Sequence, residues 1–424
     1  MLEMRKMKDS GIEWIGEIPE GWEVLAHKYI MHKEKSICEH YNGEDIISLT
    51  LNGVVKRDLE NPSGKMPTTF DGYQFVEPND LLLCLFDIDV TPRCVGLVKD
   101  HGLTSPAYSR FKVHSGFCNS YYDYLLRFID DEKVFVHLSK NLRSSLTESD
   151  FSAIKTVVPP KAEQQRIADY LDNGTFEINT LLSKTRSSIE EYQKLKQAVI
   201  TQAVTKGVRG EREMKDSGVE WIGKIPVGWG ISRIKYVSIF EPSCDFRKLT
   251  PETIITYSPM ECIKNGTFER RTSLYGKLAH TLTPFQDGDI VMAKVTPCFE
   301  NGNIAIMNEL QSGYGLGSSE LFVFRPQNIN TRYLFYWLQN NLFVHQACAT
   351  MTGTGGLKRI SPSFVKNCNI HYPSTAEQSQ IADYLDAKCA EIDRLIAKKE
   401  QLVKELESYK KSLIYEVVTG KRGV

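Results

Sequence analysis

Two long stretches of the chain place apolar residues at every third or fourth position. The first follows Pro159 and Pro160, the second follows Pro373, and Gly207 and Gly420 mark where the patterns end. Steps of three and four put the apolar side chains on one helical face, so each stretch predicts a helix of about 44 residues, roughly 66 Å long. Because so long an apolar stripe is not stable in water, the two helices are expected to pack together as a coiled coil. The residues predicted to form its seam are Leu171, Ile178, Leu181, Ile189 and Leu195 in the first helix and Leu385, Ile392, Leu395, Leu402, Leu406 and Leu413 in the second.

Between these helical stretches the pattern changes to short apolar runs bounded by turn residues. Strand-like runs occur at Leu81 to Phe86, Ile290 to Val295 and Leu321 to Phe324. Asp80 and Asp289 each end a turn sequence (EPND and QDGD) directly before the first two runs. These matching positions predict that the two intervening segments share a mixed α/β fold, although their sequences differ.

The chain contains a long internal repeat. Met7 to Trp22 returns at Met214 to Trp229 with 13 of 16 positions identical, and Ala162 to Asp172 returns at Ala376 to Asp386 with 9 of 11 identical. The segments between these blocks barely resemble each other. Repeated blocks that enclose two dissimilar segments predict two different binding domains held by equivalent structural elements. Such an arrangement suits a target with two different parts.

Chain order predicts how the helices pair. For their stripes to overlap, the second helix must run back along the first, which gives an antiparallel pair with one domain at each end. The predicted fold class is α+β: two α/β domains joined by two long helices that form an antiparallel intramolecular coiled coil, with a pseudo-twofold relation. An exposed coil that dimerises between chains is the alternative. The predicted segments are a repeated lead (1–19), a first variable domain (20–158), a first helical spacer (159–207), a repeated lead or linker (208–226), a second variable domain (227–371) and a second helical spacer (372–424).

Composition narrows the class of protein. Of 424 residues, 41% are hydrophobic and 25% charged, as in ordinary globular proteins. No apolar run is long enough to span a membrane, and the N-terminus lacks the apolar core of a signal peptide. The ten cysteines have no CxxC spacing, which favours a reducing cytoplasm over a disulfide scaffold. His345-x-x-Cys348 and Cys368-x-x-His371 are spaced too loosely to favour zinc, so no metal site is predicted.

Charge is distributed unevenly between the two variable domains. The whole chain carries −1, whereas residues 20–158 hold 15 basic and 20 acidic residues (−5) and residues 227–371 hold 14 and 10 (+4). If both domains bind a nucleic acid, the first must gather its basic residues on one face, or partner subunits must supply positive charge.

The sequence lacks several common catalytic motifs. It lacks a phosphate-binding GxxxxGK[ST] loop, the Asn-Pro-Pro-aromatic motif of amino-methyltransferases and a glycine-rich dinucleotide turn. The glycine-rich run from Gly353 to Arg359 favours a flexible basic loop.

Basic and polar residues instead gather beside loops in both variable domains. Such side chains contact phosphates and base edges in protein–DNA complexes. For Thr296, which precedes Pro297, a structural role in a strand-ending turn is an equally good interpretation. The candidate DNA-binding residues are Lys56, Arg57, Arg93, Ser105, Tyr108, Arg143, Lys294, Thr296, Asn301, Ser318, Lys358 and Arg359.

These motifs together resemble a known family. The doubled WIG-x-IP-x-GW lead begins at Trp14 and Trp221, and P-x3-EQ-x2-IA-x-YLD begins at Pro159 and Pro373. With the long helices that end in VT and glycine, this pattern resembles the specificity subunit of type I restriction-modification systems over nearly the whole chain. The runs DVTPRCVG, GLTSPAYS, MAKVTPCFENGNIAI and GSSELFVFRP look like parts of its target-recognition domains.

The resemblance implies a function without catalysis in this chain. Each target-recognition domain (20–158 and 227–371) would bind one half of an asymmetric bipartite site in double-stranded DNA, and the coiled coil would set the gap. Two modification methyltransferase subunits, and through them restriction subunits, would dock on it in the cytoplasm. S-adenosylmethionine, ATP and Mg would belong to these partners, with no cofactor in this chain.

Two other kinds of protein remain open. One is an enzyme with an unrecognised active site. The other is a coiled-coil scaffold, or a stand-alone bipartite DNA-binding protein, without restriction-modification partners.

Overall fold

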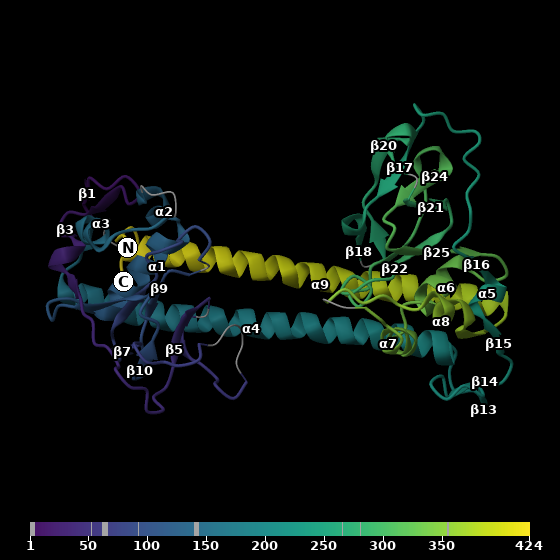
Figure 1. Ribbon diagram of the computed structural model, residues 1–424, viewed down its shortest axis with the longest axis horizontal. Helices are drawn as coiled ribbons and strands as arrows, with labels where there is room; N and C mark the ends of the chain where they lie inside the picture. Colours follow the sequence, from purple (N-terminus) through teal and green to yellow (C-terminus); the bar gives the residue numbers. More distant parts are fainter. Residues whose placement is uncertain are drawn as a thin grey trace. The chain divides into compact units, whose positions relative to one another are not determined.

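The chain forms two compact units in a computed structural model. Unit 1 comprises Met1–Thr185 and Gln401–Val424, and unit 2 comprises Arg186–Glu400. Each unit contains one α/β domain together with part of both long helices (Figure 1). The structure describes residues 5–51, 53–61, 67–91, 93–139, 144–264, 266–279, 281–353 and 356–424.

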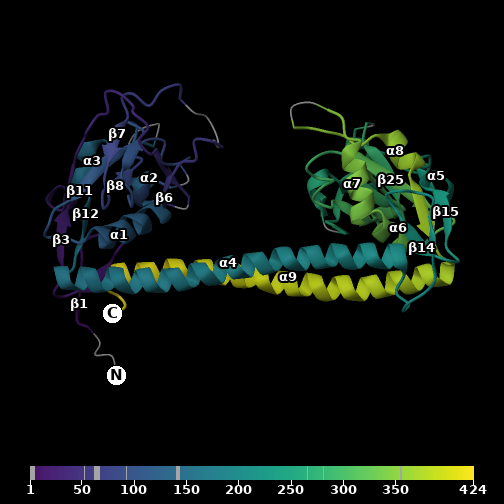
Figure 2. The ribbon, with the colours of Figure 1, turned by 90° about the horizontal axis from the view of Figure 1, so that it is seen from below.

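The two predicted helices are both present and unbroken. In unit 1, Lys410 Nζ donates to Asn179 Oδ1 (2.8 Å), and the Arg422 guanidinium lies 6.0 Å from the centre of the Tyr170 ring. As the residue number of a contact increases along the first helix, from 170 to 179, that of its partner on the second helix decreases, from 422 to 410. The helices are therefore antiparallel, and they lie side by side in both views (Figures 1 and 2). The helices are α4 (Lys161–Lys206) and α9 (Thr375–Val418).

Unit 2 has the same helix direction. Lys399 Nζ lies 5.7 Å from the Tyr192 ring centre, and Lys196 pairs with Asp393 at 2.7 Å. The predicted antiparallel pairing is therefore confirmed within each unit.

Glycines end both helices, as predicted. Gly207 and Gly420 adopt φ of +79° and +75°, a left-handed conformation that side chains with a Cβ rarely tolerate. A Cβ on Gly420 would also lie 2.5 Å from Pro19 Cδ. Beyond this turn, Lys421 Nζ donates to the Ile15 carbonyl (2.6 Å), which ties the end of the chain to the first lead.

Three predicted seam positions are wrong. Leu181 is 50% exposed, and Leu195 and Leu402 are also exposed, whereas Leu182 is 6% exposed within the unit 1 core. Neighbouring residues on a helix point about 100° apart, so a shift of one position moves a side chain from the seam toward solvent. The other predicted seam residues are buried or half-buried: Leu171, Ile178, Ile189, Leu385, Ile392, Leu395, Leu406 and Leu413.

Unit 1 is built around an antiparallel sheet of order β4-β11-β8-β9, with α1 packed beside β9. The pairs β1-β2, β3-β12, β5-β6 and β7-β10 complete it. The strands are β1 (Met7–Asp9), β2 (Glu17–Pro19), β3 (Glu23–Ala26), β4 (Met31–Lys33), β5 (Ile47–Thr50), β6 (Gly53–Lys56), β7 (Gln74–Val76), β8 (Leu81–Leu83), β9 (Val95–Leu97), β10 (Gly102–Thr104), β11 (Ser109–Val113) and β12 (Lys155–Val158). The helices are η1 (His27–Tyr29), α1 (Asn119–Asp131), α2 (Val134–Leu138) and α3 (Glu148–Ala153).

Unit 2 repeats this plan with an antiparallel sheet of order β16-β25-β22-β23, and adds a mixed sheet of order β20-β17-β24-β21. The pairs β13-β14, β15-β26 and β18-β19 complete it. The strands are β13 (Met214–Asp216), β14 (Lys224–Pro226), β15 (Gly230–Arg233), β16 (Ser238–Phe240), β17 (Ile254–Ser258), β18 (Ile263–Lys264), β19 (Thr267–Phe268), β20 (Arg271–Leu274), β21 (Thr283–Gln286), β22 (Ile290–Ala293), β23 (Ile304–Ile306), β24 (Tyr314–Gly317), β25 (Leu321–Pro326) and β26 (Asn369–Tyr372). The helices are α5 (Ile234–Val237), α6 (Thr331–Trp337), α7 (Asn341–Ala349), α8 (Pro362–Asn367), η2 (Met260–Cys262), η3 (Tyr275–Lys277) and η4 (Gln311–Gly313).

A matching ion pair confirms that the two α/β domains share a fold. Asp80 accepts from Arg110 Nε (2.5 Å) in unit 1, and Asp289 accepts two bonds from Arg325 (2.8 Å each) in unit 2. Each aspartate ends the turn before one sheet strand, and each arginine lies on the neighbouring strand. The aspartates predicted to be equivalent therefore clamp the same two strands in both units.

The repeated helix motif attaches each α/β domain to the helices. Tyr124 donates to Asp172 and Tyr336 donates to Asp386, both at 2.8 Å. Asp172 and Asp386 are the last residues of the two YLD sequences. The same hydrogen bond at both positions explains why the repeat keeps an aspartate there.

Buried tyrosines make a second matching attachment. Tyr121 of α1 donates to the Val418 carbonyl (2.9 Å), and Tyr333 of α6 donates to the Val204 carbonyl (3.3 Å). Each carbonyl belongs to the last turn of a long helix, where no intrahelical partner remains.

The seam correction can be tested with two neighbouring residues. Leu182→Ala is expected to lower the free energy of unfolding by about 2–5 kcal/mol because it leaves a cavity, whereas Leu181→Ala should change it by about 0.5 kcal/mol or less. Chemical denaturation followed by circular dichroism measures both. If the two substitutions lowered the free energy of unfolding equally, the original prediction that Leu181 lies in the seam would stand.

Buried histidines predict loss of stability in acid. Burial lowers the pKa of His27 and of His371 from 6.5 to about 4. Because the folded state resists protonation, their contribution is complete above pH 6.5 and is lost as pH falls toward 4. Thermal melts of wild type should decline across this window. His371→Gln, whose side-chain amide can still donate to the Val204 carbonyl, should decline less; an identical pH profile would contradict this account.

Candidate nucleic-acid interface

Three of the residues predicted in unit 2 converge on Glu320. Arg359 donates to both carboxylate oxygens (2.8 Å each), and its guanidinium holds the pKa of Glu320 below the usual range. The Lys294 amide donates to the Glu320 carbonyl (3.0 Å), and Ser318 Oγ accepts from the Glu320 amide (3.2 Å). Residues 294, 318 and 359, far apart in sequence, therefore form one local surface.

Lys294 lies directly after strand β22, with its side chain against an aromatic ring. Its Nζ lies 5.5 Å from the centre of the Phe322 ring, which supports the side chain, and the residue is half-buried. Lys358 is exposed on the loop that also carries Arg359. An exposed lysine and a half-buried lysine beside a polar turn are suited to phosphate or base contacts.

Thr296 has a structural role, which corrects the prediction that it contacts DNA. It is buried, its hydroxyl donates to the Gly356 carbonyl (2.9 Å), and it accepts from the Lys358 amide (2.9 Å). Thr296 therefore positions the basic loop rather than contacting a ligand, as the alternative interpretation of a strand-ending turn proposed.

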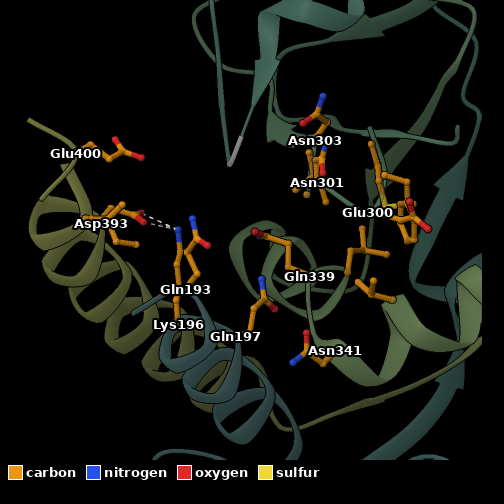
Figure 3. Close-up of a pocket in the computed structure, with 17 residues that line it drawn as sticks. Gln193, Lys196, Gln197, Glu300, Asn301, Asn303, Gln339, Asn341, Asp393 and Glu400 are labelled. Atoms are coloured by element: carbon orange, nitrogen blue, oxygen red, sulfur yellow. Dashed lines mark hydrogen bonds and ion pairs between the residues drawn. The ribbon is translucent and has the colours of Figure 1, made fainter. Parts of the chain in front are cut away.

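Asn301 is exposed at a separate site, a polar cavity of about 530 Å³ within unit 2. Figure 3 shows Asn301 and Asn303 on one side of this cavity and Lys196 and Asp393, which form an ion pair, on the other. The residues that line this cavity do not include Lys294, Ser318, Glu320 or Arg359.

In unit 1 a buried glutamine holds the turn that carries the predicted residues Ser105 and Tyr108. Gln74 Nε2 donates to the carbonyls of Ser105 (3.0 Å) and Tyr108 (2.7 Å), and the Tyr108 amide donates back to Ser105 (3.1 Å). Burial raises the pKa of Tyr108, so its phenol remains a neutral hydrogen-bonding group. The Gln74 side chain thus fixes the backbone of the turn, while Ser105 and Tyr108 remain half-buried.

Lys56 ends strand β6 of the β5-β6 hairpin, and Arg57 follows it. Lys56 is exposed and pairs with Asp45 at 2.6 Å, and Arg57 is half-buried. The Arg57 amide donates to the Ile46 carbonyl (2.7 Å), and Ile46 forms a bridge with Leu103, two residues before Ser105. These residues form the unit 1 counterpart of a basic and polar surface.

Arg93 lies in a different environment from the other unit 1 candidates. It is largely buried and pairs with Asp131 at the end of α1 (3.4 Å). Asp131 balances the positive charge of Arg93 in this ion pair. A contact between Arg93 and DNA stays a prediction. Arg143, also predicted, lies outside the described residues.

Sequence reasoning missed Gln74 and Glu320, the residues that organise the two surfaces. Both act on residues distant in sequence, so no local spacing could identify them. Among the described residues, no group of three or more His, Cys, Asp and Glu could hold a metal ion, and no helix is both long and apolar enough to cross a membrane.

The chain is similar to known specificity proteins. A family model described as the type I restriction modification DNA specificity domain matches residues 257–406. The EcoEI type I restriction enzyme specificity subunit of Escherichia coli is 32% identical over 163 residues, which cover 37% of this chain and 27% of the relative. The putative MjaX specificity subunit of Methanocaldococcus jannaschii is 25% identical over 312 residues, covering 70% of this chain and 67% of that protein.

A solved structure has a similar fold. It comes from work on complex assembly and conformational transition of the type I R-M system and has a TM-score of 0.69 at 14% identity, covering 96% of this chain and 99% of that one. The likeness extends over both α/β domains and both long helices.

The role of Thr296 yields a test of how the basic loop is positioned. Thr296→Val keeps the side-chain volume but removes both 2.9 Å hydrogen bonds, which should loosen residues 356–359 by about 1–3 kcal/mol. Hydrogen exchange at the Lys358 amide should accelerate, and Thr296→Ser should retain wild-type protection. Unchanged protection in Thr296→Val would show that the hydroxyl does not hold the loop.

Proposed function

We propose that this chain, which belongs to the family of type I restriction-modification specificity subunits, is the DNA-recognition component of such a system. Each α/β domain binds one half of a bipartite site in double-stranded DNA. The chain itself performs no catalysis and carries no cofactor.

The observation that carries this proposal is a repeated frame with different surfaces. The sheets β4-β11-β8-β9 and β16-β25-β22-β23 have the same strand order and the same Asp–Arg clamp. The surfaces attached to them differ: one is organised by Gln74 beneath Ser105 and Tyr108, the other by Glu320 among Lys294, Ser318 and Arg359. Two different surfaces carried by the same structural frame are suited to two DNA half-sites of different sequence.

The side chains at these surfaces have suitable chemistry. Lysine and arginine neutralise phosphates and contact guanine edges, and serine and tyrosine hydroxyls bond backbone oxygens. The first variable domain has a net charge of −5, so bound methyltransferase subunits must supply part of the phosphate contact there.

The long helices set the gap between half-sites and provide the docking frame for partners. Because α4 and α9 are each continuous, a change in their length is transmitted along the helix rather than absorbed by a break. Two modification methyltransferase subunits dock on the duplicated frame, and restriction subunits join through them. S-adenosylmethionine, ATP and Mg act in these partners.

Methylome sequencing of cells with and without this chain tests the proposal. Adenine methylation at one asymmetric bipartite motif should appear only when both the chain and its methyltransferase are present. If purified chain alone bound such a site tightly while methylation did not depend on it, the chain would be a stand-alone DNA-binding protein. A chain that joins proteins without binding DNA in gel shifts would be a scaffold.

Helix length predicts the gap directly. Removing seven residues from each long helix, at positions that pair in the antiparallel arrangement, shortens the frame by about 10 Å, or about three base pairs. The methylated motif should keep both half-sites and lose about three base pairs of gap. Insertion of seven residues in each helix is the matched control and should lengthen the gap. An unchanged gap in both variants would contradict the spacer role.

A further inference from the structure

The polar cavity of unit 2 has the size and lining of a small-molecule site. Its volume of about 530 Å³ lies within the range of roughly 300–1,000 Å³ that such sites occupy. The cavity is bounded by both long helices, by the loop that follows β22 and by the turn between α6 and α7 (Figure 3). Segments distant in sequence thus meet around one space within a single unit.

Part of the cavity wall is apolar and well packed. Met292, Phe299, Ile304 and Leu338 line it, each is at most 4% exposed, and all four belong to the main buried cluster of unit 2. A wall of this kind is suited to the face of a planar ring.

Six side-chain amides line other parts of the cavity. Each carboxamide offers an acceptor oxygen and two N–H donors, so these groups recognise a ligand that has donors and acceptors side by side. Figure 3 shows Gln339 between the asparagines of the loop and the glutamines of α4. The six residues are Gln193, Gln197, Asn301, Asn303, Gln339 and Asn341.

Gln197 presents an acceptor that lacks a donor. Its Oε1 is excluded from solvent and accepts no hydrogen bond from the described residues. A buried acceptor without a partner is destabilising, and a ligand that donates an N–H to it would remove that cost. We therefore expect the ligand to carry an N–H group where it reaches Gln197.

The helix pair itself does not require a glutamine at this position. Lys196 of the cavity wall is matched by Lys410, 214 residues later, and both lysines bond across the helix pair. At the same offset Gln197 is matched by Lys411, a charged residue. The cross-helix lysine is thus part of the repeated frame, whereas Gln197 belongs to unit 2 alone.

Charge limits which ligands the cavity accepts. One lysine and three carboxylates give its lining a net charge of −2 at neutral pH. Lys196 is neutralised by Asp393 at 2.7 Å, whereas Glu300 and Glu400 form no ion pair with any described residue. Because like charges repel, these two carboxylates disfavour the phosphates of a nucleotide or of DNA.

We propose that this cavity binds an adenine nucleoside that carries no phosphate. The apolar wall receives the face of the ring, and the exocyclic amino group donates to Gln197 Oε1. The neighbouring carboxamides pair with the N6–N7 edge, the edge of adenine that asparagine and glutamine bind in DNA. Glu300 and Glu400 exclude the phosphorylated forms. This site is separate from DNA recognition and does not rest on the proposed function.

Isothermal titration calorimetry of the purified full-length chain with adenosine tests the proposal. One adenosine should bind per chain. Inosine has a carbonyl in place of the amino group and cannot donate to Gln197 from that position, so it should bind at least about tenfold more weakly. AMP should also bind at least about tenfold more weakly at low salt, because its phosphate meets the two carboxylates. These comparisons use the wild-type chain and need no variant.

Two further variants locate the site. Gln197→Leu should weaken adenosine binding at least about tenfold. Gln202→Leu is the matched control, since Gln202 is exposed on the same helix and does not line the cavity, and it should leave adenosine binding unchanged. Glu300→Gln/Glu400→Gln removes both unpaired carboxylates and should narrow the difference between adenosine and AMP. Wild-type melting temperatures confirm that the variants are folded.

Three results would overturn the proposal. They are failure of adenosine to bind the wild-type chain, equal affinity for adenosine and inosine, and unchanged adenosine affinity in a folded Gln197→Leu variant. Each would leave DNA recognition untouched, which the methylated motif tests separately.

Discussion

The apolar seam between α4 and α9 is the interaction on which the rest of each unit depends. In unit 1 the residues of this seam, among them Leu171, Leu182 and Leu413, belong to the same buried cluster as the sheet and helix α1. In unit 2, Ile200, Ile381 and Leu385 likewise share a cluster with α6 and the central sheet. The largest buried cluster of each unit therefore includes both the long helices and the α/β domain. The helix pair is part of the main folding core of each unit.

Polar attachments give this hydrophobic contact a defined geometry. The tyrosine–aspartate bonds at Asp172 and Asp386 and the tyrosine–carbonyl bonds at Val418 and Val204 fix where each domain sits on its own part of the helices. Buried polar groups of this kind contribute modestly when paired but are costly when a partner is lost. They explain why the frame is repeated almost unchanged while the surfaces it carries differ.

Much of the fold could be predicted from periodicity, because long helices and their glycine ends leave strong local signals. The equivalence of Asp80 and Asp289 was also visible, since each ends a turn before a buried strand. The exact seam could not be read from the sequence, because Leu181 and Leu182 are both apolar and only the partner helix distinguishes them. The candidate site was harder to predict. Thr296 and Lys294 are two residues apart, yet the Thr296 hydroxyl is bonded to a loop while the Lys294 side chain lies against Phe322. Gln74 and Glu320 left no signal because their partners are brought together only by the tertiary fold.

If each α/β domain recognises its own half-site independently on a duplicated frame, exchange of one domain should change only one half of the methylated motif. The most direct measurement replaces residues 227–371 with a second copy of residues 20–158 and determines the methylated motif in cells that contain the methyltransferase. The account predicts a symmetric motif, with the first half-site present twice in inverted orientation and the original gap. A motif that still contained the second half-site would contradict it, because recognition would then reside outside the exchanged domain.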